Sequence, residues 1–321
     1  MESPSGRKVA ALLLGLAVVV PLILLMFIGP ASRGTPHELP IGVAGPAPAV
    51  QQVEAALEAK QPGAFEVHAY ADEAQLTQAV KNRDIYGGFV LGAAPATIIA
   101  SGASPAVATM LTQIGAQMPG PQPQVRDVAA PAPNDPRGAG FGSMVMPVFL
   151  AGAALGLALT MVVGRREITA VLLPVGAAVV GATTVGVAMW IGVLSGGFWG
   201  QWLAMSIGIL AISAAVAGLV ALMGPAGVGV AALLFMLVGM PLAGIASPPE
   251  FLPSIWGAVG QWLPLGATGT ALRSAVFFDG AGSAAAYVAL GLWIVVGYLL
   301  LLVVAASRDI VGYVDYPGVR D

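Results

Sequence analysis

The feature that most constrains this chain is a long stretch without a single ionisable side chain. No Asp, Glu, Lys, Arg or His occurs from Ile168 to Pro249, and a second charge-free stretch lies between Asp279 and Arg308. A charge at the centre of a bilayer costs about 2.5–3.5 kcal/mol on insertion scales, so long charge-free stretches are typical of segments in lipid. The chain is therefore predicted to be an integral membrane protein.

Composition supports this prediction and excludes several other classes. Of the 321 residues, 57% are hydrophobic and only 9% are charged, whereas soluble domains carry about 25% charged residues. The formal net charge of -3 and the lack of a basic stripe argue against nucleic acid as a partner. The chain has no cysteine, which excludes disulfides, thiol catalysis and cysteine metal sites.

Hydropathy predicts six transmembrane helices, because a span needs about 20 apolar residues at a rise of 1.5 Å each. The predicted spans are 9–29, 140–163, 168–194, 202–222, 228–246 and 284–306. The first apolar segment is longer than the roughly 7–15 residues of a signal peptide, so an uncleaved anchor is favoured over a cleaved signal. Arg7 and Lys8 before it indicate a cytoplasmic N-terminus.

Loop charges agree with this topology. Counted from a cytoplasmic N-terminus, the loop that holds Arg165 and Arg166 and the tail that holds Arg308 both fall inside. The excess of basic residues in cytoplasmic loops predicts the same sides independently. The expected location is the plasma membrane, with both termini cytoplasmic: 1–33 would hold the N-terminus and first span, and 308–321 the cytoplasmic tail.

The segment 34–118 differs in kind, because most of the charges lie there and strand-like and helix-like patterns alternate along it. The predicted strands are 39–45, 65–71, 86–92 and 96–102, and the predicted helices are 50–60, 72–83 and 104–118. This alternation indicates a small α/β domain. The predicted fold class is thus an α-helical polytopic membrane protein with an extracytoplasmic α/β domain between helices 1 and 2. A Pro-rich linker, 119–138, would join that domain to helices 2–6 within 139–307.

The segment 246–282 follows the fifth predicted span and is rich in Pro, Gly and Trp. In FLPSIWGAVGQWL, which starts at Phe251, apolar residues recur at helical spacing along one face. The stretch is too short to span a bilayer, so it would be a helix in the outer interface or half of a re-entrant hairpin. Trp256 and Trp262 suit headgroup depth because an indole is apolar with one polar N–H.

Glu250, Arg273 and Asp279 are the only charges between Ile168 and Ser307. Glu250 and Arg273 could gate an outward exit or contact a lipid headgroup. The alternative is that all three mark where the chain meets water, and it is favoured because they lie outside the predicted spans.

Catalytic patterns are weak. His68 and Glu66 lie two residues apart on a predicted strand, so they point to the same side. They could act as a general base with its orienting carboxylate, but two solvent-facing side chains are the favoured interpretation. None of the three lysines follows a glycine-rich phosphate-binding loop. The sequence therefore predicts that the chain is not an enzyme and binds no cofactor or metal of its own.

The layout resembles the ABC-2-type permease superfamily, in the branch of phage-infection-protein-like membrane proteins that have a large first extracytoplasmic domain. The resemblance covers nearly the whole chain. Its local carriers are LPIGVAG, AQLTQAVKNRDIYGGFVLG and above all SPPEFLPSIWGAVGQWLPLGATGTALR before the last span. In the family, this last pattern forms an outer re-entrant element. The matching positions are Pro248, Glu250, Leu252, Pro253, Leu263, Pro264, Leu272 and Arg273.

The resemblance also implies partners. Family members export lipids, polysaccharides, drugs or peptides and are paired with a separate ATPase. The chain would accordingly work as a dimer, formed with a second copy or with a paralogue. The ATPase contact would fall at Gly164–Thr169, with Arg165, Arg166 and Glu167 as coupling residues. The outer gate would comprise Glu250, Phe251, Pro253, Trp256, Trp262, Pro264 and Arg273.

Two functions follow as hypotheses. The first is a permease subunit that moves a hydrophobic or amphipathic substrate outward, with ATP used by a partner subunit and the lipid bilayer as surroundings. The second is a non-transporting, membrane-anchored binding or assembly protein that acts through its extracytoplasmic domain.

Overall fold

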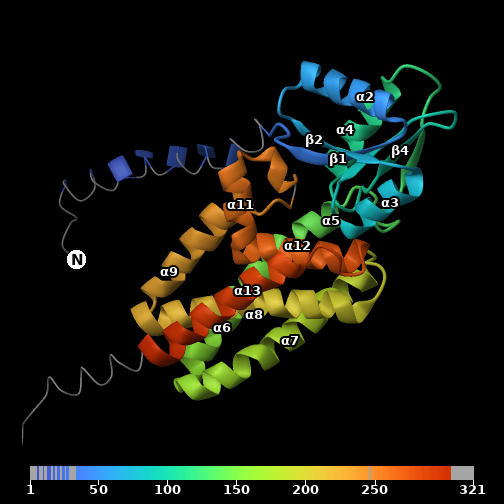
Figure 1. The fold of residues 1–321 in the computed structure, drawn as a ribbon. Helices are drawn as coiled ribbons and strands as arrows, with labels where there is room; N and C mark the ends of the chain where they lie inside the picture. The colour runs from blue at the N-terminus through green and yellow to red at the C-terminus, as the bar shows by residue number, and fades with distance from the viewer. Residues whose placement is uncertain are drawn as a thin grey trace, which may run out of the picture.

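The structure is a computed structural model that describes residues 34–304 except 246, with isolated positions between 6 and 28. The predicted first span lies largely, and the tail 308–321 wholly, outside the described residues. The described chain has an α/β domain at one end of a helical region (Figure 1).

The α/β domain is built on a five-stranded sheet of order β2-β1-β3-β4-β5. Its strands are β1 (Leu39–Ala44), β2 (Phe65–Tyr70), β3 (Gly87–Val90), β4 (Ala96–Ile99) and β5 (Gln124–Asp127). All neighbouring strands are parallel except β3 and β4. The four predicted strands are confirmed, whereas β5 arises within the tract that the sequence marks as a linker. Part of that tract is thus the edge of the sheet.

Three helices cover the sheet: α2 (Ala47–Lys60), α3 (Glu73–Asn82) and α4 (Pro105–Ala116). They match the three predicted helices. The side chains of Asp72 and Ser104 cap α3 and α4 by accepting the amides of Gln75 and Val107, as is usual for Asp and Ser before a first helical turn. Helices α2 and α4 share one apolar core with the sheet, and α3 belongs to a second core on the other face.

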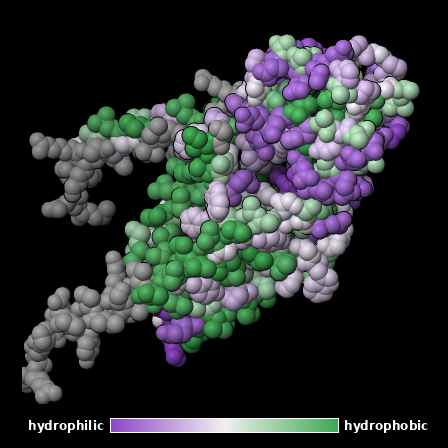
Figure 2. Space-filling view, viewed as in Figure 1, coloured by the Kyte–Doolittle hydropathy of each residue, from purple (hydrophilic) through white to green (hydrophobic). Residues whose placement is uncertain are grey.

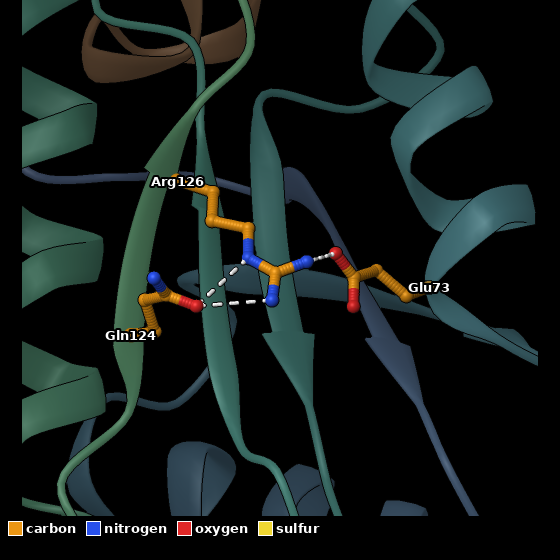
Figure 3. Close-up of polar contacts among 3 residues, drawn as sticks. All are labelled: Glu73, Gln124 and Arg126. Atoms are coloured by element: carbon orange, nitrogen blue, oxygen red, sulfur yellow. Dashed lines mark hydrogen bonds and ion pairs between the residues drawn. The ribbon is translucent and has the colours of Figure 1, made fainter.

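An arginine ties the edge strand to α3. Arg126 on β5 forms an ion pair with Glu73 and also donates to Gln124 Oε1 at 3.0–3.2 Å (Figure 3). The side chains of Arg126 and Glu73 are 46% and 34% exposed, so water screens this contact.

Among the residues that the structure describes, the helical region contains four helices long and apolar enough to cross a membrane: Ala139–Val163, Arg166–Trp190, Phe198–Met223 and Ala284–Val303. They comprise α5 (Ala139–Ser143) with α6 (Val145–Val163), α7 (Arg166–Trp190), α8 (Phe198–Met223), and α13 (Ala284–Leu299) with the π-helical Leu300–Val304. These helices agree with the second, third, fourth and sixth predicted spans. Helix α8 is central, since 78% of its most apolar stretch is buried against 22%, 22% and 28% in the others.

The fifth predicted span, 228–246, differs from what the structure shows. Helix α9 (Ala226–Ala232), the π-helical Leu233–Gly239 and α10 (Met240–Leu242) form one short apolar helix that stops before Gly244. Gly244 adopts a φ of 67°, a left-handed conformation that ends the helix. At 1.5 Å a residue, such a helix is shorter than the roughly 30 Å of hydrocarbon.

The segment 246–282 is more helical than the sequence predicts. A 3-10 turn (Pro249–Phe251) leads into α11 (Ser254–Trp262), which agrees with the predicted amphipathic helix. A second helix, α12 (Pro264–Phe277), follows at once and packs against α8 and α13. We refer to α11 and α12 as the helical hairpin.

Close backbone contacts hold the helical region together. A Cβ on Gly218 of α8 would lie 2.6 Å from the carbonyl oxygen of Gly297 on α13, and one on Gly156 of α6 would collide with the backbone of Ser213 on α8. Small residues allow this approach where dispersion rather than water drives packing. In contrast, a Cβ on Gly186 would meet nothing within 4 Å.

The two regions have opposite exteriors. Hydrophobic residues cover the visible face of the helical region, and hydrophilic residues gather on the α/β domain (Figure 2). Large exposed apolar side chains on the helices include Val162, Trp190, Trp199 and Val303. An exterior of this kind is typical of helices that face lipid.

Candidate functional site

The candidate site lies at the junction where the α/β domain packs onto the helical hairpin. Phe278, just after α12, is 6% exposed and belongs to the same apolar core as α3. A Cβ on Gly102 of the domain would lie 2.6 Å from the Phe277 ring. The His37 amide donates to the Glu250 carbonyl at 2.9 Å. The junction is thus a packed core with backbone hydrogen bonds.

Arg83 crosses from the α/β domain to α12. Its backbone is left-handed at the end of α3, with φ 65°. The guanidinium donates to the Thr270 carbonyl and to the Ser274 hydroxyl, and it lies 5.5 Å from the centre of the Phe278 ring. Burial lowers the pKa of Arg83, but a guanidinium remains charged at neutral pH. Sequence reasoning missed this residue, because its partners are 187 and 191 positions away.

Tyr86 makes the second crossing contact. Its hydroxyl donates to Glu250 Oε2 at 2.8 Å. Burial, with the nearby Glu250 carboxylate as a smaller cause, raises the pKa of Tyr86 well above its usual range. The phenol therefore stays protonated at neutral pH and can donate to Glu250. The predicted gate residue Glu250 is thus held by the α/β domain.

Arg273 is buried, which corrects the interpretation that it marks where the chain meets water. It is 6% exposed, and its two terminal nitrogens donate to the carbonyls of Gly244 and Ile245 at 3.5 and 3.1 Å. The guanidinium lies 5.3 Å from the centre of the Phe141 ring, and Nε has no partner. The sequence interpretation was wrong because it did not foresee that α12 packs into the helical region.

A cavity of about 420 Å³ opens beside Arg273, between the α/β domain and the domain-facing ends of the helices. We call it the junction cavity. Its lining includes Ser101, Arg137, Phe141, Met240, Ile245 and Arg273.

A second cavity, of about 600 Å³, lies within the α/β domain between α2 and α4. We call it the α2–α4 cavity. Mostly apolar side chains line it, including Val53, Phe65, Phe89, Leu91, Met110 and Ile114. Its volume lies in the roughly 300–1,000 Å³ range of small-molecule sites.

The remaining predicted gate residues divide between the domain and the hairpin. Phe251 packs against the core beneath α2 and α4. Trp256 and Trp262 are 50% and 54% exposed on α11, and Pro264 is buried where α12 begins. Pro253, immediately before α11, is exposed. The structure therefore brings Glu250 and Phe251 to the domain and leaves the tryptophans on the hairpin's exterior.

The predicted coupling residues lie at the other end of the helical region, in the tight turn from α6 to α7 (Figure 1). Gly164 ends α6 with φ 64°, and Arg166 begins α7. The side chains of Arg165 and Glu167 are exposed. Because α6 starts beside the α/β domain and runs away from it, its 19 residues at 1.5 Å each separate this turn from the junction by about 28 Å.

His68 and Glu66 do lie together on the edge strand β2, with 3.6 Å between Nε2 and Oε1. Their side chains are 42% and 61% exposed. This arrangement is a solvent-facing pair on a sheet edge.

No protein-family model matches this chain, and no curated protein or solved structure matches it either. A function must therefore be argued from geometry and chemistry.

Proposed function

We propose that this chain is the membrane subunit of an exporter of the ABC-2 type, which moves a hydrophobic or amphipathic substrate outward past the helical hairpin. The observation that carries the proposal is the packing of the α/β domain onto that hairpin. Arg83 and Tyr86 bind α12 and Glu250, so the hairpin cannot move without breaking their contacts or carrying the domain with it.

The orientation follows from charge. Basic residues favour the cytoplasmic side of short loops, so Arg165 and Arg166 would face the cytoplasm. The α/β domain, at the other end of α6, would then be extracytoplasmic. This assignment makes the hairpin an outer gate of the plasma membrane and gives the α6–α7 turn access to a cytoplasmic ATPase.

Cysteine labelling tests the orientation cleanly, since the natural chain has no cysteine. Lys81→Cys places a thiol on the exposed surface of the α/β domain, and Arg165→Cys places one in the α6–α7 turn. A membrane-impermeant maleimide added to intact cells should label only the first variant. Labelling of Arg165→Cys alone would invert the topology and exclude an outward gate.

Coupling to an ATPase is tested by reversing charge in the α6–α7 turn. The Arg165→Glu/Glu167→Arg double variant should lose a co-purifying ATPase in mild detergent and lose ATP-driven export in vesicles. Lys81→Glu, an equally exposed change on the α/β domain, is the matched control and should retain both. If the unmodified chain recovers no ATPase and ATP drives no export, the proposal fails.

The second candidate is a non-transporting binding or assembly protein, and the α2–α4 cavity favours it. Ala56 is an exposed residue of α2 that lines this cavity, so Ala56→Trp would fill it. If Ala56→Trp abolishes complementation of a strain that lacks the chain, while the charge reversal at Arg165 and Glu167 does not, the second candidate is correct.

A further inference from the structure

We infer that the junction cavity binds an anionic amphiphile, with its phosphate or carboxylate head at Arg273 and its apolar tail toward the helices. This inference deepens the proposed function by naming the substrate class of the junction. Binding of this ligand requires neither ATP nor a partner subunit. Experiments can therefore refute ligand binding at the junction cavity and ATP-driven export independently of each other.

The first argument is a buried charge that has no anionic partner in direct contact. Within the described residues no carboxylate lies within 4 Å of Arg273. The carbonyls of Gly244 and Ile245 and the Phe141 ring are neutral partners. A buried guanidinium is normally paired with an anion, because leaving it unpaired is strongly unfavourable.

The neighbouring carboxylates already have other donors. Glu250 accepts from Tyr86, Asp135 accepts the Phe141 amide, and Asp127 accepts from Ser101. Arg83 adds a second buried cation to the junction, bound to a carbonyl and a hydroxyl. Within the described part of the chain, Arg273 therefore forms no direct ion pair, and the Glu250 carboxylate acts on it electrostatically without contacting it.

The second argument is the cavity's lining. Ser101 and the exposed Arg137, which precede α5, and Arg273 of α12 contribute polar groups to the same lining. Apart from Arg273 and Ser143, the lining residues of the helical region, which include Phe141, Val145, Met240 and Ile245, have no hydrogen-bonding side chain. Two guanidiniums in an otherwise largely apolar lining match a molecule with an anionic head and a hydrocarbon tail.

Size is consistent with this ligand. A cavity of about 420 Å³ falls within the usual range of ligand sites, and it accommodates a headgroup with the start of a tail. The nitrogen Nε of Arg273 is buried and has no hydrogen-bond partner among the described residues, so the guanidinium keeps an unsatisfied N–H. Each terminal nitrogen also keeps one N–H beyond its bond to a carbonyl, and guanidinium N–H groups bind phosphate and carboxylate strongly.

The experiment measures ligand binding to the purified full chain in a non-ionic detergent by isothermal titration calorimetry. The probes are dihexanoyl phosphatidic acid, dihexanoyl phosphatidylcholine and inorganic phosphate. We expect phosphatidic acid to bind at least about tenfold more tightly than either of the others, because only it combines an anionic head with a tail. Equal affinity for phosphatidylcholine would overturn the anionic head, and equal affinity for inorganic phosphate would overturn the amphiphile.

Two variants locate the site. Arg273→Met keeps an unbranched apolar side chain but removes the charged head, and should weaken phosphatidic acid binding by about tenfold or more. Gly142→Leu leaves Arg273 intact and fills the cavity, since a Cβ on Gly142 meets nothing within 4 Å and the glycine is part of the lining. It should also weaken binding at least about tenfold.

Arg126→Met, which removes an exposed guanidinium from β5, is the control and should bind phosphatidic acid as the natural chain does. If Gly142→Leu folds and binds phosphatidic acid normally, the junction cavity is not the site, whatever becomes of Arg273→Met. Binding that persists in a chain without ATP-driven export would support this inference while refuting the proposed function.

Discussion

The α/β domain and the helical region differ in which side chains they expose. Except for Arg83 at the junction, the domain keeps most of its charges on the outside, around two apolar cores. The helical region presents apolar side chains outward and packs backbones together inside. The difference shows that hydropathy of the surface, and not of the core, distinguishes a region built for water from one built for lipid.

Two arginines make the comparison concrete. Arg126, on the domain, is half exposed and paired with Glu73. Arg273, at the junction, is buried and meets only carbonyls and a ring. Moving a guanidinium out of water costs several kcal/mol unless an anion compensates it. The exposed ion pair of Arg126 and Glu73 therefore contributes little to stability. The burial of Arg273 involves the larger free-energy term, which is the cost of removing its guanidinium from water.

The largest change in stability is expected from a substitution that disrupts packing inside the helical region. Gly156→Leu would drive a side chain into the backbone of Ser213, which cannot move aside as a flexible side chain could. We expect a loss of about 3 kcal/mol or more in the free energy of unfolding, since overpacked interfaces relax poorly. Unfolding in mixed detergent micelles would measure it.

The matched control is Gly186→Leu, on the exposed face of α7 where nothing lies within 4 Å of a Cβ. It should be neutral or slightly stabilising because leucine favours helix more than glycine does. Equal destabilisation by both variants would show that the two faces of the helices do not differ as described.

A smaller effect is expected at the border between the regions. Tyr86→Phe removes the donor to the Glu250 carboxylate and should destabilise the chain by about 1–2 kcal/mol. Thermal unfolding of the two proteins at neutral pH would measure the difference.

The same variant has a signature in pH. Because the folded pKa of Tyr86 is raised above its ordinary value of 10.0, the folded state holds this proton more tightly than the unfolded state. The stabilisation is complete below pH 10.0 and declines as pH rises toward the folded pKa. The natural chain should therefore lose more stability than Tyr86→Phe above pH 10.0. Parallel pH profiles would contradict this account.

The smallest effect is expected on the surface of the α/β domain. Arg126→Gln removes an exposed ion pair and should change stability by less than about 1 kcal/mol, with the difference shrinking in salt. Glu73→Gln should change stability by a similarly small amount. The Arg126→Gln/Glu73→Gln double variant should be little less stable than either single variant. A double-mutant cycle with a coupling above about 2 kcal/mol would refute the view that water screens this pair.

Much of the fold could be predicted from local patterns. The alternating segments of the domain and the long apolar runs of α6, α7, α8 and α13 specify their elements by periodicity and length. Helix α12 escaped prediction because PLGATGTALRSAVF is rich in small residues and has no strong apolar face. Strand β5 escaped because QVRD is short and exposed, and only its pairing with β4 makes it a strand.

The site was predictable only in part, for the same reason. Glu250 and Arg273 stood out as rare charges in an apolar sequence. Arg83 and Tyr86 did not, because charged and phenolic residues are ordinary in a polar domain. Their significance comes from contacts more than 160 positions away, and no local pattern encodes such a contact.

The central place of α8 has a consequence for biogenesis. Its earlier neighbours α6 and α7 leave the ribosome first, but α12 and α13, which complete its surroundings, are synthesised last. Until they arrive, α8 has an unfinished side, and Thr268 of α12 is not yet there to fill the space beside Gly208. The packing around α8 can therefore be completed only after α12 and α13 have been synthesised. A chain truncated before α12 would leave one side of α8 without its packing partners, and we expect such a chain to be degraded.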